Sequence, residues 1–384
     1  MKDRYSSLIP TFVQIGFFCF LSIHLTSCNS KQKKLDSKDL VEIKSSVKYA
    51  KGFDIVQDDK GKKLVIYSPY PGAETPLIFE IGYEGESQDN KIVVPLKKVI
   101  ATSTTHIPMM ELLGVSDRLV GFPNTQYICS ENVMNRVDKG LVTDVGNGQE
   151  FNMEIIFALG ADAVIGNSMG AGDKKYEVIK RRGIPVIFNG EWLEESPLGR
   201  AEWIKFFGVL FDKERQADSL FSDIEARYLE VKDMAHKADS KPRIFSGNLF
   251  KDQWHLPAGE SFKAKLYDDA NMEYIWGDSE GQASLVLSFE SVFEKAKDAD
   301  LWIGAGYHTS YSSLRDAHRH YENFDSFANK RIYTFSKRNN GKGGVLYFEL
   351  APVRPDIVLK DLVKTAHPQL LPDYEPFFLS PLDD

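Results

Sequence analysis

Cysteine is scarce in this sequence, and so is any excess of positive charge. The 384 residues include only three cysteines, Cys19, Cys28 and Cys129. Their spacing forms no CxxC pair, no zinc site with histidine and no disulfide framework. The net charge is −8 and the pI is near 5.6. Because nucleic-acid binding normally requires a basic patch, we expect no nucleic-acid partner.

Evidence for a catalytic site is also scarce. The sequence contains no HExxH motif, and GxSxG occurs only at 166–170 and 277–281. A hydrolase would have to use Ser103 or Ser168 as its nucleophile without a recognisable base. The glycines of "GNSMGAG" (166–172) do not have the spacing of a dinucleotide-binding fingerprint. We therefore expect no enzyme activity and no cofactor, and we keep a secreted hydrolase as the alternative from another functional class.

Residues 1–27 resemble a bacterial lipoprotein signal peptide. Lys2 and Arg4 precede the apolar stretch "LIPTFVQIGFFCFLSIHL", and "LTS" then leads to Cys28. The resemblance implies cleavage before Cys28 and lipidation of its sulfur, which would hold the protein stably at a membrane. Residues 28–50 are too polar to pack and are predicted to form a tether. An ordinary secretory signal or a transmembrane anchor is the alternative, and each of these places the protein outside the cytoplasm.

Two distant stretches share one pattern. Residues 151–166 read "FNMEIIFALGADAVIG", and residues 288–304 read "SFESVFEKAKDADLWIG". Each combines an amphipathic helix, an Ala-Asp pair and a buried strand that ends at glycine. Glu154 and Glu290 mark equivalent helix starts. The repeat predicts two lobes with one plan, and it favours a structural role for Glu154 and Asp162 over a catalytic carboxylate pair.

The rest of the chain fits the same plan. Strands that alternate with helices through short loops predict parallel sheets, and hence Rossmann-like α/β lobes. A long amphipathic helix without Gly or Pro is predicted between them, because apolar residues recur there at helical spacing. The predicted segments are a short β-rich addition over 51–95, an α/β lobe over 96–211, the linking helix over 212–240 and a second α/β lobe over 241–384.

This order of elements resembles the substrate-binding proteins of ABC importers whose two lobes are joined by one rigid helix. "TSTTHIPMMELLGV" (102–115) and the repeated pair carry the resemblance, which covers roughly residues 97–370. The class captures iron–siderophore complexes, haem, vitamin B12 or, in another branch, bare metal ions. The resemblance implies an iron-siderophore type chelate as ligand, with cobalamin or haem as alternatives. It also implies a permease and its ATPase as partners. A lipoprotein that uses the cleft as a sensor or assembly surface stays open.

Ligand contacts are expected from loops at the carboxyl ends of the strands, where the lobes face each other. Aromatic side chains there offer stiff faces to a flat ligand. The predicted contacts are Thr104, His106, Tyr127, Met169, Trp192, Trp254, His255, Tyr307, His308, Arg338 and Asn339. If the three histidines converged, they would bind a metal ion or a haem iron; ordinary loop histidines are the alternative. Arg338 would bind an anionic siderophore, or simply belong to a mobile turn. No histidine-rich acidic loop is present, so we expect no site for a bare metal ion.

The resemblance also implies one acidic residue per lobe that docks on the permease. The repeat suggests Asp173 or Glu177 in the first lobe and Asp316 or Glu322 in the second. Ordinary surface charge is the alternative for each. The rigid linking helix further predicts a preformed cleft and only small lobe movements.

Overall fold

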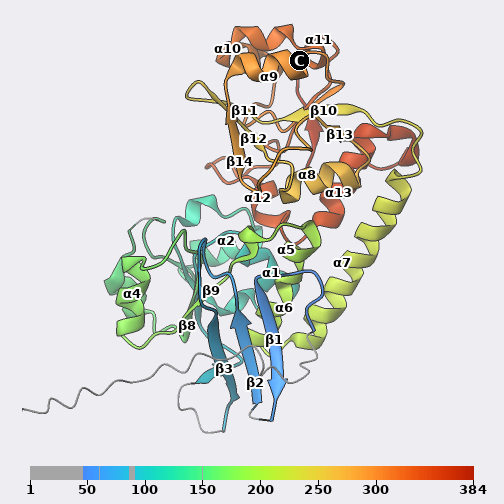
Figure 1. Cartoon of the computed structure of the whole chain (residues 1–384). Coiled ribbons are helices and arrows are strands. Elements are labelled where there is room, and N and C mark those ends of the chain that lie inside the picture. The colour runs from blue at the N-terminus through green and yellow to red at the C-terminus, as the bar shows by residue number, and fades with distance from the viewer. Residues whose placement is uncertain (1–45, 60, 86–90, 149) are drawn as a thin grey trace, which may run out of the picture. The chain divides into compact units, whose positions relative to one another are not determined.

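A computed structural model of the chain describes residues 46–59, 61–85, 91–148 and 150–384 (Figure 1). The predicted signal peptide, the lipidation site Cys28 and most of the predicted tether lie outside these residues. Among the residues described, no helix combines the length and the apolar character that crossing a bilayer requires.

The first lobe contains a five-stranded parallel sheet in the order β7-β6-β5-β8-β9. Its strands are β5 (Val99–Ala101), β6 (Leu119–Phe122), β7 (Thr143–Asp144), β8 (Ala163–Gly166) and β9 (Val186–Phe188). The helices between them are α1 (His106–Leu112), α2 (Glu131–Asp138), α3 (Met153–Ala158) and α4 (Lys174–Arg181). The central strands β5 and β8 and the edge strand β9 are buried throughout, as expected of a sheet with both faces covered.

The predicted β-rich addition is a four-stranded sheet in the order β1-β2-β3-β4. Its strands are β1 (Phe53–Asp58), β2 (Gly61–Ile66), β3 (Leu77–Tyr83) and β4 (Lys91–Val94). Phe53, Leu64 and Ile81 are buried in the same apolar cluster as the helices of the first lobe. The addition therefore shares the core of that lobe and has no separate core of its own.

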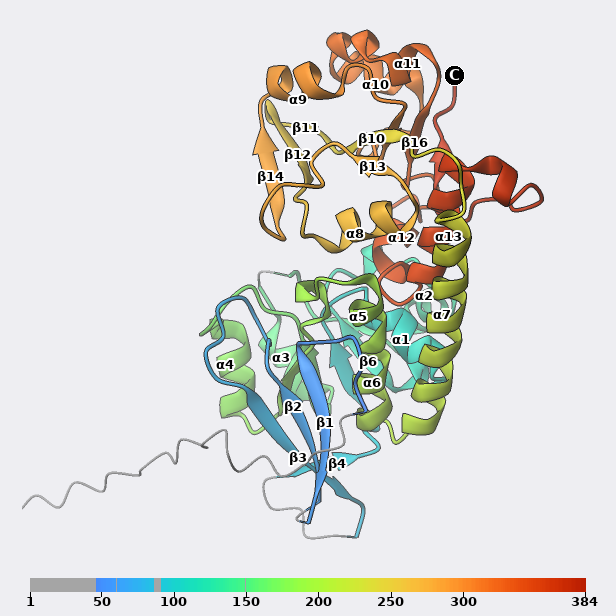
Figure 2. The same ribbon diagram turned by 45° about the vertical axis from the view of Figure 1, so that its right-hand side comes forward.

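The linking helix is α7 (Glu214–Ala235), which runs along one side of both lobes (Figures 1 and 2). Its buried positions recur at intervals of three and four residues, as a single apolar stripe requires. They are Ala217, Phe221, Ile224, Tyr228, Val231 and Ala235. The helix is shorter at both ends than the predicted segment 212–240. Two short helices, α5 (Pro197–Glu202) and α6 (Ile204–Leu210), precede it.

The second lobe has a main sheet in the order β13-β10-β15-β16-β17. Its strands are β10 (Arg243–Ser246), β13 (Glu273–Tyr274), β15 (Leu301–Ile303), β16 (Ile332–Thr334) and β17 (Ser380–Pro381). All pairs are parallel except β16 with β17. The helices of this lobe are α8 (Phe262–Asp269), α9 (Phe289–Ala296), α10 (Tyr311–Ala317), α11 (Asp325–Ala328), α12 (Leu346–Leu350) and α13 (Pro355–Ala366).

A second, antiparallel sheet in this lobe was not predicted. It consists of β11 (Asn248–Phe250), β12 (Gln253–Pro257) and β14 (Ser284–Leu287). The two-residue turn between β11 and β12 places Lys251 and Asp252 at φ values of 48° and 63°. Such turns usually carry Asn-Gly or Asp-Gly, so the sequence lacked the usual hairpin signal.

The repeated pattern occupies equivalent positions in the two lobes. α3 precedes β8, which pairs with β5, and α9 precedes β15, which pairs with β10. The aspartates of the two Ala-Asp pairs have the same role. Asp162 accepts hydrogen bonds from the backbone N–H groups of Lys97 and Lys98, and Asp300 accepts one from that of Arg243. Each aspartate thus holds the start of the neighbouring strand, which confirms that the repeat is structural.

Candidate functional site

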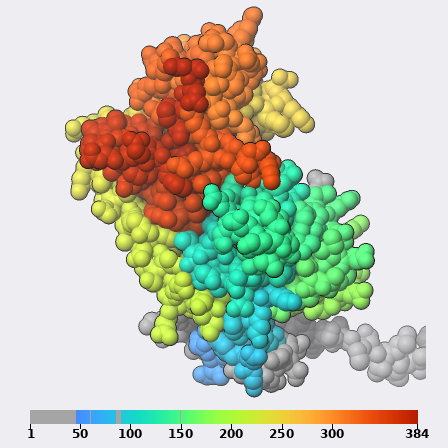
Figure 3. Space-filling model, turned by 180° about the vertical axis from the view of Figure 1, so that it is seen from behind, coloured from blue at the N-terminus to red at the C-terminus, as the bar shows by residue number. Residues whose placement is uncertain are grey.

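A cleft of about 700 Å³ lies between the lobes, and an apolar recess of about 280 Å³ adjoins it. The first lobe contributes the segment 192–200, which follows β9. The second lobe contributes α8, β12 and the loops after β10, β15 and β16. These loops lie at the carboxyl ends of parallel strands, where α/β folds usually bind ligands. Seen from behind, the orange and red second lobe lies directly on the cyan and green first lobe (Figure 3).

Aromatic rings dominate the apolar part of the cleft. Tyr307 is 72% exposed, and its ring lies 6.2 Å from that of Phe348. Phe335 stacks on Tyr347 with the ring centroids 4.0 Å apart. Trp192 lies at the boundary between the cleft and the recess. Such surfaces suit a bulky or flat ligand, because the rings offer large, rigid contact areas.

Two cations, one from each lobe, reach the same space. The guanidinium of Arg200, on α5, lies 3.7 Å from the ring centroid of Phe262, on α8, and it donates to the carbonyl oxygen of Trp192. Lys263 is the next residue of α8. Burial, and secondarily the charge of Arg200, lowers the pKa of the Lys263 ammonium to about 8.

Several buried polar atoms in this region have no hydrogen-bond partner among the residues that the structure describes. They are Arg200 Nε, Trp192 Nε1 and Glu191 Oε2. The other carboxylate oxygen of Glu191 accepts a hydrogen bond of 2.8 Å from Thr105 Oγ1, and burial raises the pKa of Glu191. Unpaired buried polar atoms are rare in folded proteins because each costs free energy. All three residues line the recess, which makes its wall a candidate binding surface.

The structure brings three of the predicted contact residues to the cleft. Trp192, His255 and Tyr307 line it. Thr104, Met169 and His308 are at least partly exposed but are not among its lining residues. The sequence did not indicate Arg200, Phe262, Lys263, Phe335, Tyr347 and Phe348. Most of these lie on helices, whereas the prediction considered only loops after strands.

Two predicted contacts are wrong because the structure places them in the core. His106 begins α1, and its ring packs 5.7 Å from that of Phe207. Burial lowers the pKa of His106 to about 3, so the ring is neutral. Trp254 is fully buried, and its Nε1 donates to the carbonyl oxygen of Ser246 at 2.9 Å. The three histidines do not converge, and the described part of the chain holds no group of three or more His, Cys, Asp or Glu side chains arranged for a metal ion.

The remaining predicted contacts lie where the lobes touch. Arg338 stacks on Phe377 and donates to its carbonyl oxygen, so its charged group is directed away from the cleft. Asn339 donates to the carbonyl oxygen of Ser336. Tyr127 packs against Gly343, where a side chain would meet the Tyr127 ring at 2.9 Å and would be strained at φ 103°. The loop after β16 lines the cleft only through Phe335 and Ser336, while its later residues contact the first lobe at Tyr127 and Gln126.

The four candidate docking residues lie on surface helices. Asp173 caps α4 and pairs with Lys175 at 3.1 Å, while Glu177 pairs with Lys180 at 3.0 Å. In the second lobe Asp316 is exposed on α10. Glu322, in the 3₁₀ turn that follows, pairs with Arg315. Permease docking therefore stays a prediction for all four.

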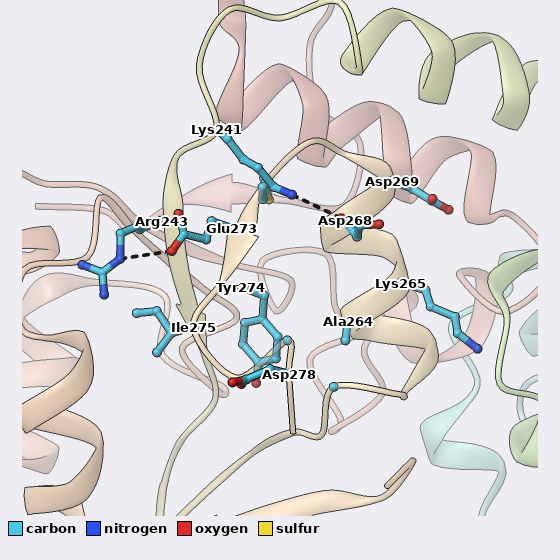
Figure 4. A pocket seen from close by; sticks show the side chains of 13 residues that line it. Lys241, Arg243, Ala264, Lys265, Asp268, Asp269, Glu273, Tyr274, Ile275 and Asp278 are labelled. Atoms are coloured by element: carbon cyan, nitrogen blue, oxygen red, sulfur yellow. Dashed lines mark hydrogen bonds and ion pairs between the residues drawn. The ribbon is translucent and has the colours of Figure 1, made fainter. Parts of the chain in front are cut away.

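A further hollow, of about 600 Å³, lies on the second lobe beside β13 (Figure 4). Four of its charged side chains form two ion pairs: Lys241 pairs with Asp268 at 3.3 Å, and Arg243 with Glu273 at 3.6 Å. With most of its charges paired, this hollow is less suited to a charged ligand than the cleft between the lobes.

Contact between the lobes also involves a buried carboxylate. Glu349, on α12, accepts hydrogen bonds from the backbone N–H groups of Cys129 at 2.7 Å and Ser130 at 2.9 Å, next to the start of α2. Asn340 adds two hydrogen bonds, to the carbonyl oxygens of Gln126 and Ile128. Burial raises the pKa of Glu349 to about 7, because its effect outweighs the lowering of the pKa by the hydrogen bonds from the Cys129 and Ser130 N–H groups.

The raised pKa of Glu349 predicts a pH-dependent stability. The folded state holds a proton on this carboxyl up to about pH 7, whereas the unfolded chain releases it near pH 4.5. The resulting stabilisation is complete below pH 4.5 and is lost as the pH rises through 7. We expect the free energy of unfolding, measured in urea relative to Glu349→Gln, to fall by about 2 kcal/mol between pH 5 and 8. A difference that stays constant with pH would contradict the assignment.

Comparison with known proteins agrees with this architecture. The periplasmic binding protein family matches residues 99–338. A lipoprotein of Methanocaldococcus jannaschii is 25% identical over 94% of this chain and 91% of its own.

Two solved structures share the fold. A possible iron-binding, periplasmic solute-binding protein of Staphylococcus epidermidis is 17% identical, with a TM-score of 0.54 over 71% of this chain and 99% of its own. A periplasmic haem-binding protein of Pseudomonas aeruginosa is 14% identical, with a TM-score of 0.56 over 75% of this chain and 99% of its own. With two α/β lobes, a linking helix and a family match over more than half its length, the chain belongs to the periplasmic binding protein family.

Proposed function

We propose that this protein captures an iron-siderophore type chelate in the cleft between its lobes and delivers it to an ABC permease and its ATPase. Cobalamin or haem, bound in the same way, is the alternative ligand. The observation that carries the proposal is the cleft of about 700 Å³ with its aromatic walls, which adjoins a recess lined by the residues that hold unpartnered buried polar atoms. The cleft has the size of a typical small-molecule site.

A chelate suits the cleft better than a bare ion. Soft or borderline metal ions need several convergent His, Cys, Asp or Glu ligands, and the described residues contain no such group. The ligand must therefore bring its own metal-binding atoms. The protein then needs only to recognise the outer surface of the complex, for which aromatic rings and a few charged groups are sufficient.

The lipid anchor belongs to the same proposal. The Methanocaldococcus jannaschii relative is a lipoprotein, which supports lipidation of Cys28 and a location outside the cytoplasm. From such an anchor the tether would keep the two lobes close to a permease in the same membrane.

Hydrolysis is less well supported. Ser103 Oγ bonds to Thr105 Oγ1 at 2.9 Å, and Ser168 Oγ donates to the carbonyl oxygen of Gly170 at 2.8 Å. Neither hydroxyl has an imidazole partner among the described residues, so neither has the general base that a serine nucleophile requires.

The test is ligand binding by the soluble protein that begins after Cys28. We would incubate it with ferrichrome, ferric enterobactin, haem and cyanocobalamin, and measure bound mass by native mass spectrometry together with visible absorption. We expect one of these classes to bind, and Tyr307→Ala to weaken that binding about tenfold because an exposed ring of the cleft is lost. Tyr67→Ala is the control, since Tyr67 is also exposed but lies outside the cleft. Binding of none of the four, together with hydrolysis of an ester or glycoside, would overturn the proposal.

A further inference from the structure

The β-rich addition reaches the cleft, although it precedes the part of the chain that matches the family, which begins at residue 99. Pro71, in the connection between β2 and β3, lines the cleft. A smaller hollow of about 250 Å³ adjoins the cleft here, because Pro71, residues 193–195 and Gln282 line both spaces. Pro71 and Gln282 are exposed, so the cleft opens to solvent at this place, which we call its mouth.

Two buried glutamates of the first lobe hold the start of the addition at this mouth. Glu202 accepts hydrogen bonds of 2.6–2.9 Å from the backbone N–H groups of residues 48–50. Glu194, which itself lines the cleft, accepts hydrogen bonds of 2.8–3.0 Å from those of Lys51 and Gly52. Hydrogen bonds to a charged acceptor are among the stronger ones in proteins, so this stretch of the addition is held in one position.

The connection between β2 and β3 is also packed against the first lobe. The ring of Tyr70 lies edge-on to that of Phe188, at the end of β9, with the ring centroids 6.1 Å apart. A Cβ atom on Gly190 would lie only 2.0 Å from the carbonyl oxygen of Ser68, so the two backbones are in direct contact. Figure 2 shows this blue connection on the side of the first lobe away from α7. Pro71 is therefore a fixed edge of the mouth.

Three side chains run from the addition across the mouth to the second lobe. Lys51 donates to the carboxylate of Glu195 at 3.0 Å. Gln282, in the segment between β13 and β14, donates to the same carboxylate, and the ammonium of Lys265 lies 3.9 Å from it. The hydrogen bond from Lys51 is the main cause that lowers the pKa of Glu195, so this carboxylate stays charged at neutral pH. Glu195 thus links the addition to the second lobe by hydrogen bonds to a charged group.

This link differs from the other hydrogen-bonded contact between the lobes. Among the described residues, hydrogen bonds join segment 46–211 to segment 241–384 in two places. In one, Glu349 and Asn340 bind backbone groups of residues 126–130, which move only if the first lobe rearranges. In the other, Glu195 and Gln282 meet through side chains alone, and exposed side chains rotate within nanoseconds. Since a rigid linking helix permits only small lobe movements, a bulky ligand passes most easily where side-chain rotation is sufficient.

We propose that Lys51, Glu195, Gln282 and Pro71 form a gate at the mouth of the cleft, through which the ligand enters and leaves. This inference rests on the proposed function and adds the path by which the ligand reaches the same site. Lys51 and Pro71 belong to the addition and stay in place, and the gate opens when the side chains of Gln282 and Glu195 rotate apart. A gate that closes over the cleft both before and after binding slows entry and release alike, so it leaves the dissociation constant nearly unchanged. The β-rich addition thereby sets the rate of ligand exchange.

The first experiment measures ligand exchange by stopped-flow tryptophan fluorescence, with whichever of ferrichrome, ferric enterobactin, haem and cyanocobalamin binds to the soluble protein. We expect Gln282→Ala to raise the association and dissociation rate constants by the same factor, about threefold or more, because it removes an exposed hydrogen bond to a charged group. Glu280→Ala is the matched control, since Glu280 is exposed in the same segment but does not line the cleft, and both rate constants should stay unchanged. Unchanged rates in Gln282→Ala would overturn the gate. Faster dissociation with unchanged association would also overturn it, because Gln282 would then be a ligand contact.

The second experiment locks the gate. In a Cys129→Ser background, the substitutions Glu195→Cys and Gln282→Cys supply two thiols that a short bismaleimide joins, and the mass of the product shows that the link has formed. Ligand bound before cross-linking should dissociate about tenfold or more slowly than from the same variant without the reagent, and ligand added afterwards should associate more slowly by a similar factor. Glu280→Cys in the same background, treated with the same reagent, should be unaffected. Unchanged exchange in the cross-linked protein would show that the ligand passes elsewhere, and would overturn this inference while the proposed function stands. Binding of none of the four chelates would overturn the proposed function and the gate with it.

Discussion

Replacing Asp361 by alanine is expected to lower the free energy of unfolding by about 3–5 kcal/mol. Asp361 lies on α13 and is fully buried. Its carboxylate accepts hydrogen bonds of 2.5–3.0 Å from the hydroxyl of Tyr374 and the backbone N–H groups of Phe377, Phe378 and Leu379. Alanine would leave three backbone donors in or near the core without partners. Each such donor costs about 1–3 kcal/mol, which makes this one of the most sensitive positions outside the cleft.

The measurement is urea unfolding followed by circular dichroism. Asp373→Ala is the control, because Asp373 lies in the same C-terminal segment but is exposed, and we expect it to change stability by less than about 0.5 kcal/mol. A loss below about 1 kcal/mol for Asp361→Ala would show that water or a rearranged backbone replaces the carboxylate.

Asp361 also shows where prediction from the sequence stops. The pattern of apolar residues predicts a terminal helix within "PVRPDIVLKDLVKTAHP", and α13 occupies Pro355–Ala366. On that pattern alone, Asp361 on the buried face of the helix argues against the predicted helix, because a charged side chain is not expected there. Its partners lie in a segment without regular secondary structure, whose path no local periodicity indicates. Long-range hydrogen bonding of this kind has no signal in a single sequence.

The features that were predicted correctly have local causes. The linking helix follows from apolar residues at intervals of three and four, and the strands from short buried runs. The paired lobes follow from a repeat that places Asp162 and Asp300 at equivalent strand starts. The helix, each strand and each copy of the repeat span fewer than thirty residues, so they can be recognised in a single sequence.

The site was predicted less well because it depends on which way side chains turn. The stretch "TSTTH" was expected to form a cleft loop, but α1 begins at His106 and its first turn directs that ring into the core. Conversely, Arg200 and Lys263 reach the cleft from helices, since the second lobe packs so that the start of α8 meets α5. The packing of one lobe on the other decides these contacts, and no stretch of sequence records it.

The hairpin of β11 and β12 gives the clearest case, because neighbouring side chains of a strand point to opposite sides. His255 consequently lines the cleft, while Trp254 lies in the core against Phe245 and Trp302, with ring centroids 5.9 and 5.3 Å away. Both were predicted to bind ligand. Without recognising the hairpin, the sequence offers no way to tell the two faces apart.

Trp254→Ala is therefore expected to act on stability and not on recognition. Removing a fully buried indole leaves a cavity among packed rings, and we expect the free energy of unfolding to fall by about 3–5 kcal/mol. Trp192→Ala should act mainly on recognition. Because Trp192 is only partly buried, we expect the free energy of unfolding to fall by less than about 1.5 kcal/mol, and we expect ligand binding to weaken about tenfold or more. Urea unfolding and the dissociation constant of the chelate that binds would be measured for both variants, with Trp254→Phe as the milder core change. Weaker binding by a stable, folded Trp254→Phe, with unchanged binding by Trp192→Ala, would mean that the ligand reaches the opposite face of this hairpin and that the cleft has been assigned to the wrong side of β12.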